Sequence, residues 1–212
     1  MSKSIVIGVD VGGTFTDIFA LDESTGSVSV AKVPSTKGDQ SVGFLSGIKA
    51  ATSDFAAVST IIHGTTVATN ALLERKGAKA GIITTAGFRD VLEMRRRDRP
   101  TTWGLWGQFV PAIERQNRLE VAERTLASGE IIQAVDAQEI KEAAEKLLLQ
   151  GCESVCLFFI NGYANPLNEA NAAKTLREVW PNDYVSVATE ILPEIREFER
   201  CSTASLNAYL QP

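Results

Sequence analysis

The sequence predicts an α/β fold built on a mixed β-sheet, and two observations support this prediction. Three short β-rich segments follow one another at the start of the chain across tight turns, an arrangement typical of an antiparallel meander. From residue 40 onward, helical and strand patterns alternate along the chain. This alternation predicts parallel strands that are joined by right-handed helical crossovers.

The meander comes first. Its strands are predicted from alternating apolar residues, and the turns between them contain glycine, aspartate and serine. The three predicted strands are Ser4–Val11, Thr14–Leu21 and Val28–Val33.

The alternating segment that follows adds helices and further strands. The predicted helices are Gln40–Ala51, Thr66–Arg75 and a segment around Phe88–Met94, and the predicted strands are Val58–Ile62 and Ala80–Thr84. The resulting β-β-β-α-β-α-β-α order fits a ribonuclease-H-like lobe, which we expect to span residues 1–94.

Residues 95–118 have no clean periodicity and include Pro100 and Pro111, so we expect a long loop there. The basic run at residues 95–99 can clamp an anion, but we favour a surface role or pairing with Asp90 and Glu93.

Residues 119–212 are expected to form a second α/β unit. A hairpin is predicted from Leu119–Arg124 and Glu130–Gln133, and a helix that Asp136 caps, with Glu139 in a capping box, is predicted to end at Leu149. The remaining predicted elements are the strands Val155–Ile160 and Tyr184–Ala188 and the helices Asn168–Val179 and Glu197–Leu210.

Composition narrows the class of protein. With 212 residues and 44% hydrophobic content the chain can bury a substantial core, and its net charge of −5 disfavours binding to nucleic acid or anionic membranes. The three cysteines, Cys152, Cys156 and Cys201, are expected to be reduced and buried, as in a cytoplasmic protein. No apolar run approaches the roughly 20 residues that a membrane span needs, and no signal peptide is expected.

The segment Asp10–Asp17 reads DVGGTFTD and predicts a phosphate-binding turn. Gly12 and Gly13 allow the backbone to approach an anion closely, and the hydroxyls of Thr14 and Thr16 can add hydrogen bonds. Carboxylates repel a bare phosphate, so we expect Asp10 and Asp17 to hold Mg²⁺ or Mn²⁺ against it. The alternative is an ordinary hairpin with a Gly-Gly turn.

A second group of polar residues follows the strand Val58–Ile62. His63 is the single histidine of the chain and can contact substrate or phosphate, or shuttle a proton, although a structural role is the alternative. Thr65, Thr66 and Asn70 can line a substrate cleft, and threonines at a helix start can equally act as caps.

Five motifs of the sequence are similar to those of a known family. They are Gly8–Asp17, the run His63–Ala71 that reads HGTTVATNA, Gly87–Glu93, Tyr163–Pro166 and Asn207–Leu210. Together they resemble the hydantoinase A/5-oxoprolinase family, which is similar in fold to the sugar kinase, Hsp70 and actin ATPase superfamily. The resemblance implies an actin-like ATPase lobe in which the Asp10–Asp17 segment is the first phosphate loop for ATP and its magnesium.

The resemblance also implies an activity. We expect the N-terminal lobe of an ATP-dependent hydrolase that opens a cyclic amide of the hydantoin or 5-oxoproline type, with Asp10 and His63 as catalytic residues. One alternative is a subunit of an ATP-dependent ketone carboxylase of the acetone or acetophenone type. Another is a non-catalytic, nucleotide-regulated binding protein.

The expected partners also follow from the resemblance. Family members are much longer, so this chain is expected to be inactive alone, with the remainder of the full-length chain and a hydantoinase B-like subunit as partners.

Overall fold

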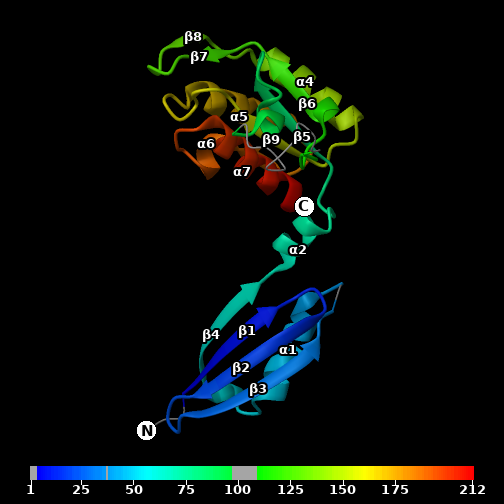
Figure 1. The fold of residues 1–212 in the computed structure, drawn as a ribbon, viewed down its shortest axis with the longest axis vertical. Coiled ribbons are helices and arrows are strands. Elements are labelled where there is room, and N and C mark those ends of the chain that lie inside the picture. The colour runs from blue at the N-terminus through cyan, green and yellow to red at the C-terminus, as the bar shows by residue number, and fades with distance from the viewer. Residues whose placement is uncertain (1–3, 37, 97–108) are drawn as a thin grey trace, which may run out of the picture. The chain divides into compact units, whose positions relative to one another are not determined.

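The computed structural model describes residues 4–36, 38–96 and 109–212, and the chain divides into two compact units. The first unit is Met1–Lys76 and the second unit is Gly77–Pro212. Each has its own sheet and its own hydrophobic core (Figure 1).

The first unit is built on a mixed sheet with the strand order β3-β2-β1-β4. The strands β1 (Ile5–Val11), β2 (Phe15–Asp22) and β3 (Ser27–Pro34) form the predicted antiparallel meander. The strand β4 (Val58–Thr65) pairs in parallel with β1. The predicted mixed sheet is therefore confirmed.

One face of this sheet forms the core of the first unit. Helix α1 (Gln40–Ala51) covers that face, and Gly47 lets it come so close that an added Cβ would lie 2.1 Å from the Ile18 Cδ1 atom. Asp39 caps the helix by accepting a hydrogen bond from the Ser41 amide. The buried apolar residues are Ile5, Ile7, Val9, Val11, Ile18, Ala20 and Ile48.

The other face of the sheet, which we call the open face, carries exposed side chains. Because side chains alternate along a strand, the open face holds Asp10 and Asp17, together with the apolar Phe19 and Val30. A short 3-10 helix (Phe55–Ala57) precedes β4, and helix α2 (Val67–Leu73) follows it.

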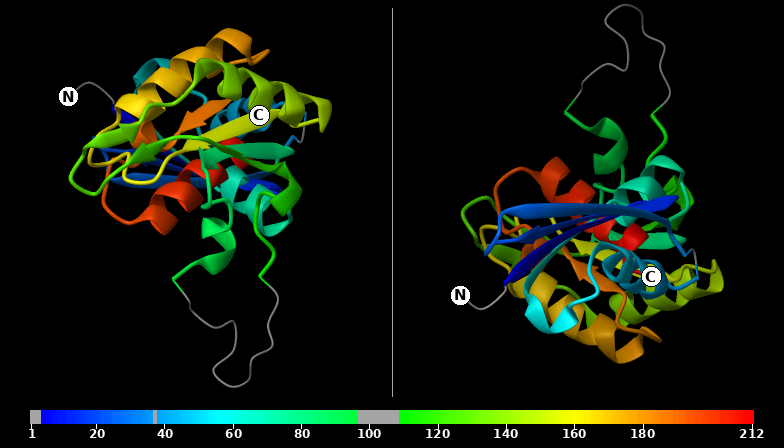
Figure 2. Two further views of the ribbon diagram at one scale, coloured as in Figure 1. Left: turned by 90° about the horizontal axis from the view of Figure 1, so that it is seen from above. Right: turned by 90° about the horizontal axis from the view of Figure 1, so that it is seen from below.

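The second unit is a parallel sheet with helices on both faces (Figure 2). Its strand order is β10-β9-β5-β6, from β5 (Ala80–Thr85), β6 (Arg118–Val121), β9 (Ser154–Phe158) and β10 (Val185–Val187). Helices α4 (Ala137–Leu149) and α5 (Leu167–Val179) pack on one face, and α3 (Val91–Met94), α6 (Ala188–Ile191) and α7 (Glu197–Leu210) pack on the other.

Two strands pair differently from the expectation. The strand β5 was expected beside the meander, in a lobe spanning residues 1–94, but it pairs with β6 and β9 in the second unit. The predicted hairpin of Leu119–Arg124 with Glu130–Gln133 is confirmed only in part, because the first part of the expected strand belongs to β6 of the parallel sheet. Only β7 (Arg124–Thr125) pairs with β8 (Ile131–Gln133). Alternating apolar residues mark a strand without indicating which strand it will pair with.

Of the remaining predictions about local structure, the structure confirms some and corrects others. Asp136 caps α4 through the Gln138 amide, but Glu139 accepts a hydrogen bond from the Ala122 amide at 2.6 Å instead of completing a capping box. The three cysteines are buried and free, as expected. Part of the expected loop at residues 95–118 lies outside the described residues, and Arg115–Asn117 forms a 3-10 helix. No helix within the described ranges is long and apolar enough to cross a membrane.

Candidate functional site

The predicted metal ligands face each other on the open face of the first unit. Asp10 of β1 lies directly opposite Asp17 of β2, and Asp10 also neighbours Gly64 of β4. Both carboxylates are on exposed residues. Beside them is a shallow hollow of about 370 Å³, which is lined by Gly8, Val9, Asp10, Asp17, Ile18, Phe19, Val30, Ile62 and Gly64. The open face therefore combines two opposed acidic side chains with an apolar hollow.

The glycine turn joins these two strands at one end of the sheet. The Gly12 amide donates to the Phe15 carbonyl at 3.0 Å, and a Cβ on Gly12 would lie only 2.9 Å from that oxygen. Only glycine fits this tight turn without a shift of the backbone. Gly13 and Thr14 are exposed at its tip, where their backbone can be reached by an anion.

The start of α2 lies beside the turn. A Cβ on Gly13 would come within 3.3 Å of the Asn70 Nδ2 atom, and this amide donates to the Thr66 hydroxyl at 3.4 Å. Thr65 donates to the Val11 carbonyl at 3.4 Å and accepts from the Val67 amide. The structure thus brings the turn together with Thr65, Thr66 and Asn70, and gives Thr65 the capping role that was the alternative.

Thr16 does not face the anion side of the turn. It is fully buried on the core face, and its hydroxyl lies 3.0 Å from that of Ser35. Ser35 in turn donates to the Gly12 carbonyl at 2.8 Å, and its amide donates to the Thr14 carbonyl. The expectation of a phosphate contact from Thr16 is corrected to a supporting role behind the turn. Alternation along β2 could have revealed it, because Thr16 and Asp17 are adjacent and must point to opposite faces.

His63 lies on the face opposite to Asp10. It pairs with the buried Val9, and its ring contacts the Phe44 ring edge-on at a centroid distance of 5.3 Å. There it lines a second hollow, of about 290 Å³, with Val11, Gln40, Ser41 and Phe44. Because the sheet separates the two side chains, the expected catalytic pair of Asp10 and His63 is not brought together.

Sequence reasoning missed Lys32. This residue of β3 lies opposite Asp17, and its Nζ atom is 3.0 Å from Asp17 Oδ1 and 3.2 Å from Asp17 Oδ2. The ammonium group also lies 5.1 Å from the centroid of the Phe15 ring, within the range of a cation–π interaction. A lysine in a strand of small apolar residues gives no signal by itself.

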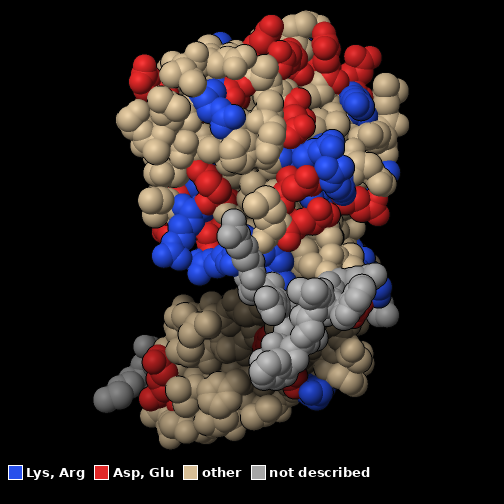
Figure 3. Space-filling model, turned by 45° about the horizontal axis from the view of Figure 1, so that its top comes forward, with Lys and Arg blue, Asp and Glu red and all other residues tan. Residues whose placement is uncertain are grey.

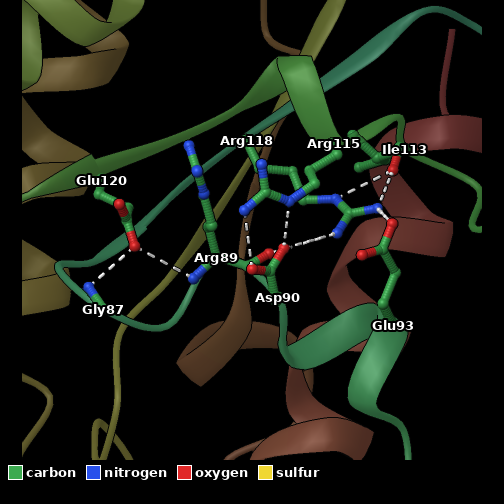
Figure 4. Close-up of polar contacts among 8 residues, drawn as sticks. All are labelled: Gly87, Arg89, Asp90, Glu93, Ile113, Arg115, Arg118 and Glu120. Atoms are coloured by element: carbon green, nitrogen blue, oxygen red, sulfur yellow. Dashed lines mark hydrogen bonds and ion pairs between the residues drawn. The ribbon is translucent and has the colours of Figure 1, made fainter.

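The Gly87–Glu93 motif belongs to a polar cluster in the second unit (Figure 4). Arg115 binds both oxygens of Asp90, and this contact holds the pKa of Asp90 below its usual value. The fully buried Arg118 contacts Glu93 at 3.2 Å and the Ile113 carbonyl at 2.8 Å. Asp90 and Glu93 therefore pair with Arg115 and Arg118, and these contacts connect helix α3 with the start of strand β6.

Two other motifs act as structural anchors in the second unit. Asn165 donates to the Gly129 carbonyl at 2.8 Å and so holds the β7–β8 hairpin. The Tyr209 carbonyl accepts from the Ala78 amide, and its ring lies where a Cβ on Gly77 would be, only 2.2 Å from the Tyr209 Cε1 atom. These contacts fix the first residues of the second unit against α7.

The second unit also contains charged side chains that are fully buried. Arg200 of α7 and Glu169 of α5 form a fully buried ion pair at 2.7 Å beyond the end of β9. Gly162 gives them space, because an added Cβ would lie 2.7 Å from Arg200 and 2.8 Å from Glu169. Burial raises the pKa of the Glu123 carboxyl, and hydrogen bonds from Thr85 and Asn168 oppose that shift.

Comparison with known proteins identifies the family of the chain. The model of the hydantoinase/oxoprolinase N-terminal region matches residues 6–180. The chain is 32% identical over 97% of its length to caprolactamase subunit alpha of Pseudomonas jessenii, and 30% identical over 97% to the acetophenone carboxylase gamma subunit of Aromatoleum aromaticum. It spans about a third of each relative, at 31% of their length.

Solved structures share the fold. The ATP-dependent caprolactamase of Pseudomonas jessenii matches with a TM-score of 0.83 at 31% identity, over 98% of this chain and 31% of the other. A nucleotide-free acetone carboxylase matches with a TM-score of 0.88 at 23% identity, over 99% of this chain and 32% of the other. The second likeness supports the fold alone, which is a mixed α/β architecture.

Proposed function

The chain belongs to the hydantoinase/oxoprolinase N-terminal region family, and from that premise we propose that it is the phosphate-binding part of an ATP-dependent enzyme that opens a cyclic amide. One observation carries the proposal: the Gly12-Gly13 turn, which is exposed at Gly13, lies at the end of two strands whose carboxylates, Asp10 and Asp17, face each other. The likeness to caprolactamase subunit alpha supports a cyclic amide as the substrate class.

The residues present fit a nucleotide that carries a divalent cation. Mg²⁺ in nucleotide sites is commonly held by one or two carboxylates, phosphate oxygens and water, and Asp10 and Asp17 supply such carboxylates from neighbouring strands. The exposed backbone of Gly13 and Thr14 would contact phosphate oxygens. A bound ATP would supply the phosphoryl group that activates the amide oxygen of the ring, with ADP as the leaving group; addition of water to that carbon would then release inorganic phosphate and break the ring C–N bond.

The chain's own residues then have separate roles. Asp10 would orient the cation at the transferring phosphoryl group, where charge must be neutralised. Ser35 and Thr16 hold the turn in shape from behind. The polar groups of Thr66 and Asn70 lie beside the turn and would border the cleft. His63 takes no part in this arrangement, because it lies on the other face of the sheet.

A ketone carboxylase is the second candidate. The 30% identity to the acetophenone carboxylase gamma subunit favours it, and the same phosphate-binding residues would serve it. Both named relatives are subunits, which supports a partner of the hydantoinase B type. The remainder of the full-length polypeptide would supply the other contacts to the nucleotide, because relatives are about three times as long.

Phosphate release from Mg-ATP tests the proposal. The full-length polypeptide and its partner subunit would be supplied with hydantoins, 5-oxoproline or caprolactam, or with ketones and bicarbonate. We expect stimulation by the cyclic amides, and stimulation by ketones would favour the carboxylase. Turnover indifferent to both would favour the nucleotide-regulated binding protein. We expect Asp10→Ala to lower stimulated turnover by about a hundredfold, and unchanged turnover would contradict the role of Asp10.

A further inference from the structure

Lys32 stands out because of where it lies. It is the one lysine or arginine on the four strands of the first sheet, and those strands are described throughout. Among the described residues, it is also the one cation within ion-pair distance of Asp10 or Asp17.

The direction of the side chain is informative. Lys32 pairs with Asp17 across the strands, while Phe15 lies two residues nearer the glycine turn on the same face. The ammonium group contacts both, at 3.0 Å from Asp17 Oδ1 and 5.1 Å from the centre of the Phe15 ring. The charge therefore lies between Asp17 and Phe15, and Phe15 directly follows the Gly12–Thr14 turn.

The charge balance of the open face explains why a lysine is useful here. Asp10 and Asp17 are like charges directly opposite each other, which is destabilising in a sheet. Lys32 reduces the negative charge of the group formed with Asp10 and Asp17 from −2 to −1. A divalent cation at the same carboxylates would repel the ammonium group, and Lys32 is about half exposed and free to turn on its flexible stem.

We propose that Lys32 is a phosphate-ordering residue, which binds Asp17 in the absence of a divalent cation and turns to a phosphate oxygen when a cation–nucleotide complex occupies the site. This inference rests on the proposed function. It assigns the lysine two alternating partners, a carboxylate of the protein and a phosphate of the ligand. Lys32 then competes with the free cation and cooperates with the nucleotide.

Two binding titrations on the full-length polypeptide test the inference without measuring activity. Free Mn²⁺ would be titrated by electron paramagnetic resonance, and a non-hydrolysable Mg-ATP analogue by calorimetry. In Lys32→Met the competing charge is lost, so Mn²⁺ should bind about fivefold more tightly. The nucleotide loses a charged hydrogen bond and should bind about tenfold more weakly.

Two variants control for other causes. Lys32→Arg keeps the positive charge, so its repulsion of Mn²⁺ remains and the Mn²⁺ affinity should stay within about twofold of wild type. Lys49→Met removes an exposed lysine from α1, which covers the opposite face of the sheet, and should change neither titration. Unfolding midpoints of all three variants would show that each is folded.

The outcomes separate the inference from the proposed function. Opposite shifts of the two affinities in Lys32→Met support the inference. If wild type binds the nucleotide but Lys32→Met leaves both affinities within twofold, or weakens both, the inference is overturned while the proposed function stands. A wild-type protein that binds no nucleotide contradicts the proposed function, and the inference with it.

Discussion

The two units of the chain differ in buried charge, since among the described residues only the second unit buries charged side chains. In the first unit the ion pair of Asp17 and Lys32 lies on the open face, with side chains that are 52% and 57% exposed. In the second unit Arg118, Arg200 and Glu169 have fully buried side chains. Figure 3 shows both signs of charge interspersed over the visible surface of the second unit, whereas the visible part of the first unit carries few charged side chains.

The exposed ion pair of the first unit can exchange its partner for a ligand, whereas the buried charges of the second unit cannot. An exposed ion pair contributes little to stability, so it is easily exchanged for a ligand. A buried charge requires its partners, because leaving it unpaired in a medium of low dielectric is costly. We therefore assign binding to the first unit and a structural role to the charged clusters of the second.

The largest expected effect comes from breaking the buried pair in the second unit. Arg200 donates to Glu169, to Glu197 and to the Phe159 carbonyl. In Arg200→Met the Glu169 carboxylate stays buried without its cation, and we expect the free energy of unfolding to fall by about 3–5 kcal/mol. Urea denaturation followed by tryptophan fluorescence measures this, because Trp180 is buried in the core of the second unit.

The matched control is Arg177→Met. Arg177 forms a bidentate pair with Glu190, but these side chains are 48% and 52% exposed. We expect a loss of less than about 1 kcal/mol. Equal losses in the two arginine variants would contradict the distinction between buried and exposed charges.

A smaller effect is expected behind the glycine turn of the first unit. Thr16→Val keeps the shape of the side chain but removes the buried hydroxyl that contacts Ser35, so stability should fall by about 1 kcal/mol. Thermal denaturation followed by circular dichroism measures the change. The exposed Thr14→Val serves as the control and should leave the midpoint unchanged. If Thr14→Val were the more destabilising variant, our account of the turn would be wrong.

The smallest expected effect depends on pH and concerns Glu123. Its pKa is raised in the folded state, mainly by burial, so the folded state binds a proton more tightly than the unfolded state. The resulting stabilisation is fully present below the unfolded pKa and is lost as pH rises through the folded pKa. Denaturation midpoints of wild type and Glu123→Gln, compared across that range, should show a weaker pH dependence in the variant. Identical profiles would exclude Glu123 as the cause.

Much of this fold could be predicted because local patterns determine it. The helices Gln40–Ala51 and Glu197–Leu210 begin and end where the sequence predicts, since apolar periodicity specifies both and Asp39 caps the first. The pairing of Ala80–Thr85 could not be predicted, because its fully buried residues suit the centre of any parallel sheet.

In the candidate site, too, some residues could be predicted from the sequence and others could not. The glycine turn and the two aspartates were visible in the sequence, because their residue types indicate the chemistry. The position of His63 depends on the register between β1 and β4, which pairs it with Val9 and pairs Gly64 with Asp10. The role of Lys32 likewise depends on the register between β2 and β3. Register is a property of the folded sheet, and a single sequence does not show it.

Magnesium-dependent nucleotide binding tests the central claim most directly. Calorimetry with a non-hydrolysable ATP analogue, with and without Mg²⁺, would compare full-length wild type with Asp10→Asn and with Glu145→Gln, which removes an exposed charge from α4. We predict that Asp10→Asn weakens binding at least about tenfold when Mg²⁺ is present and much less when it is absent, while Glu145→Gln binds like wild type. Wild-type affinity in Asp10→Asn with Mg²⁺ would contradict the assignment of the open face as the nucleotide site.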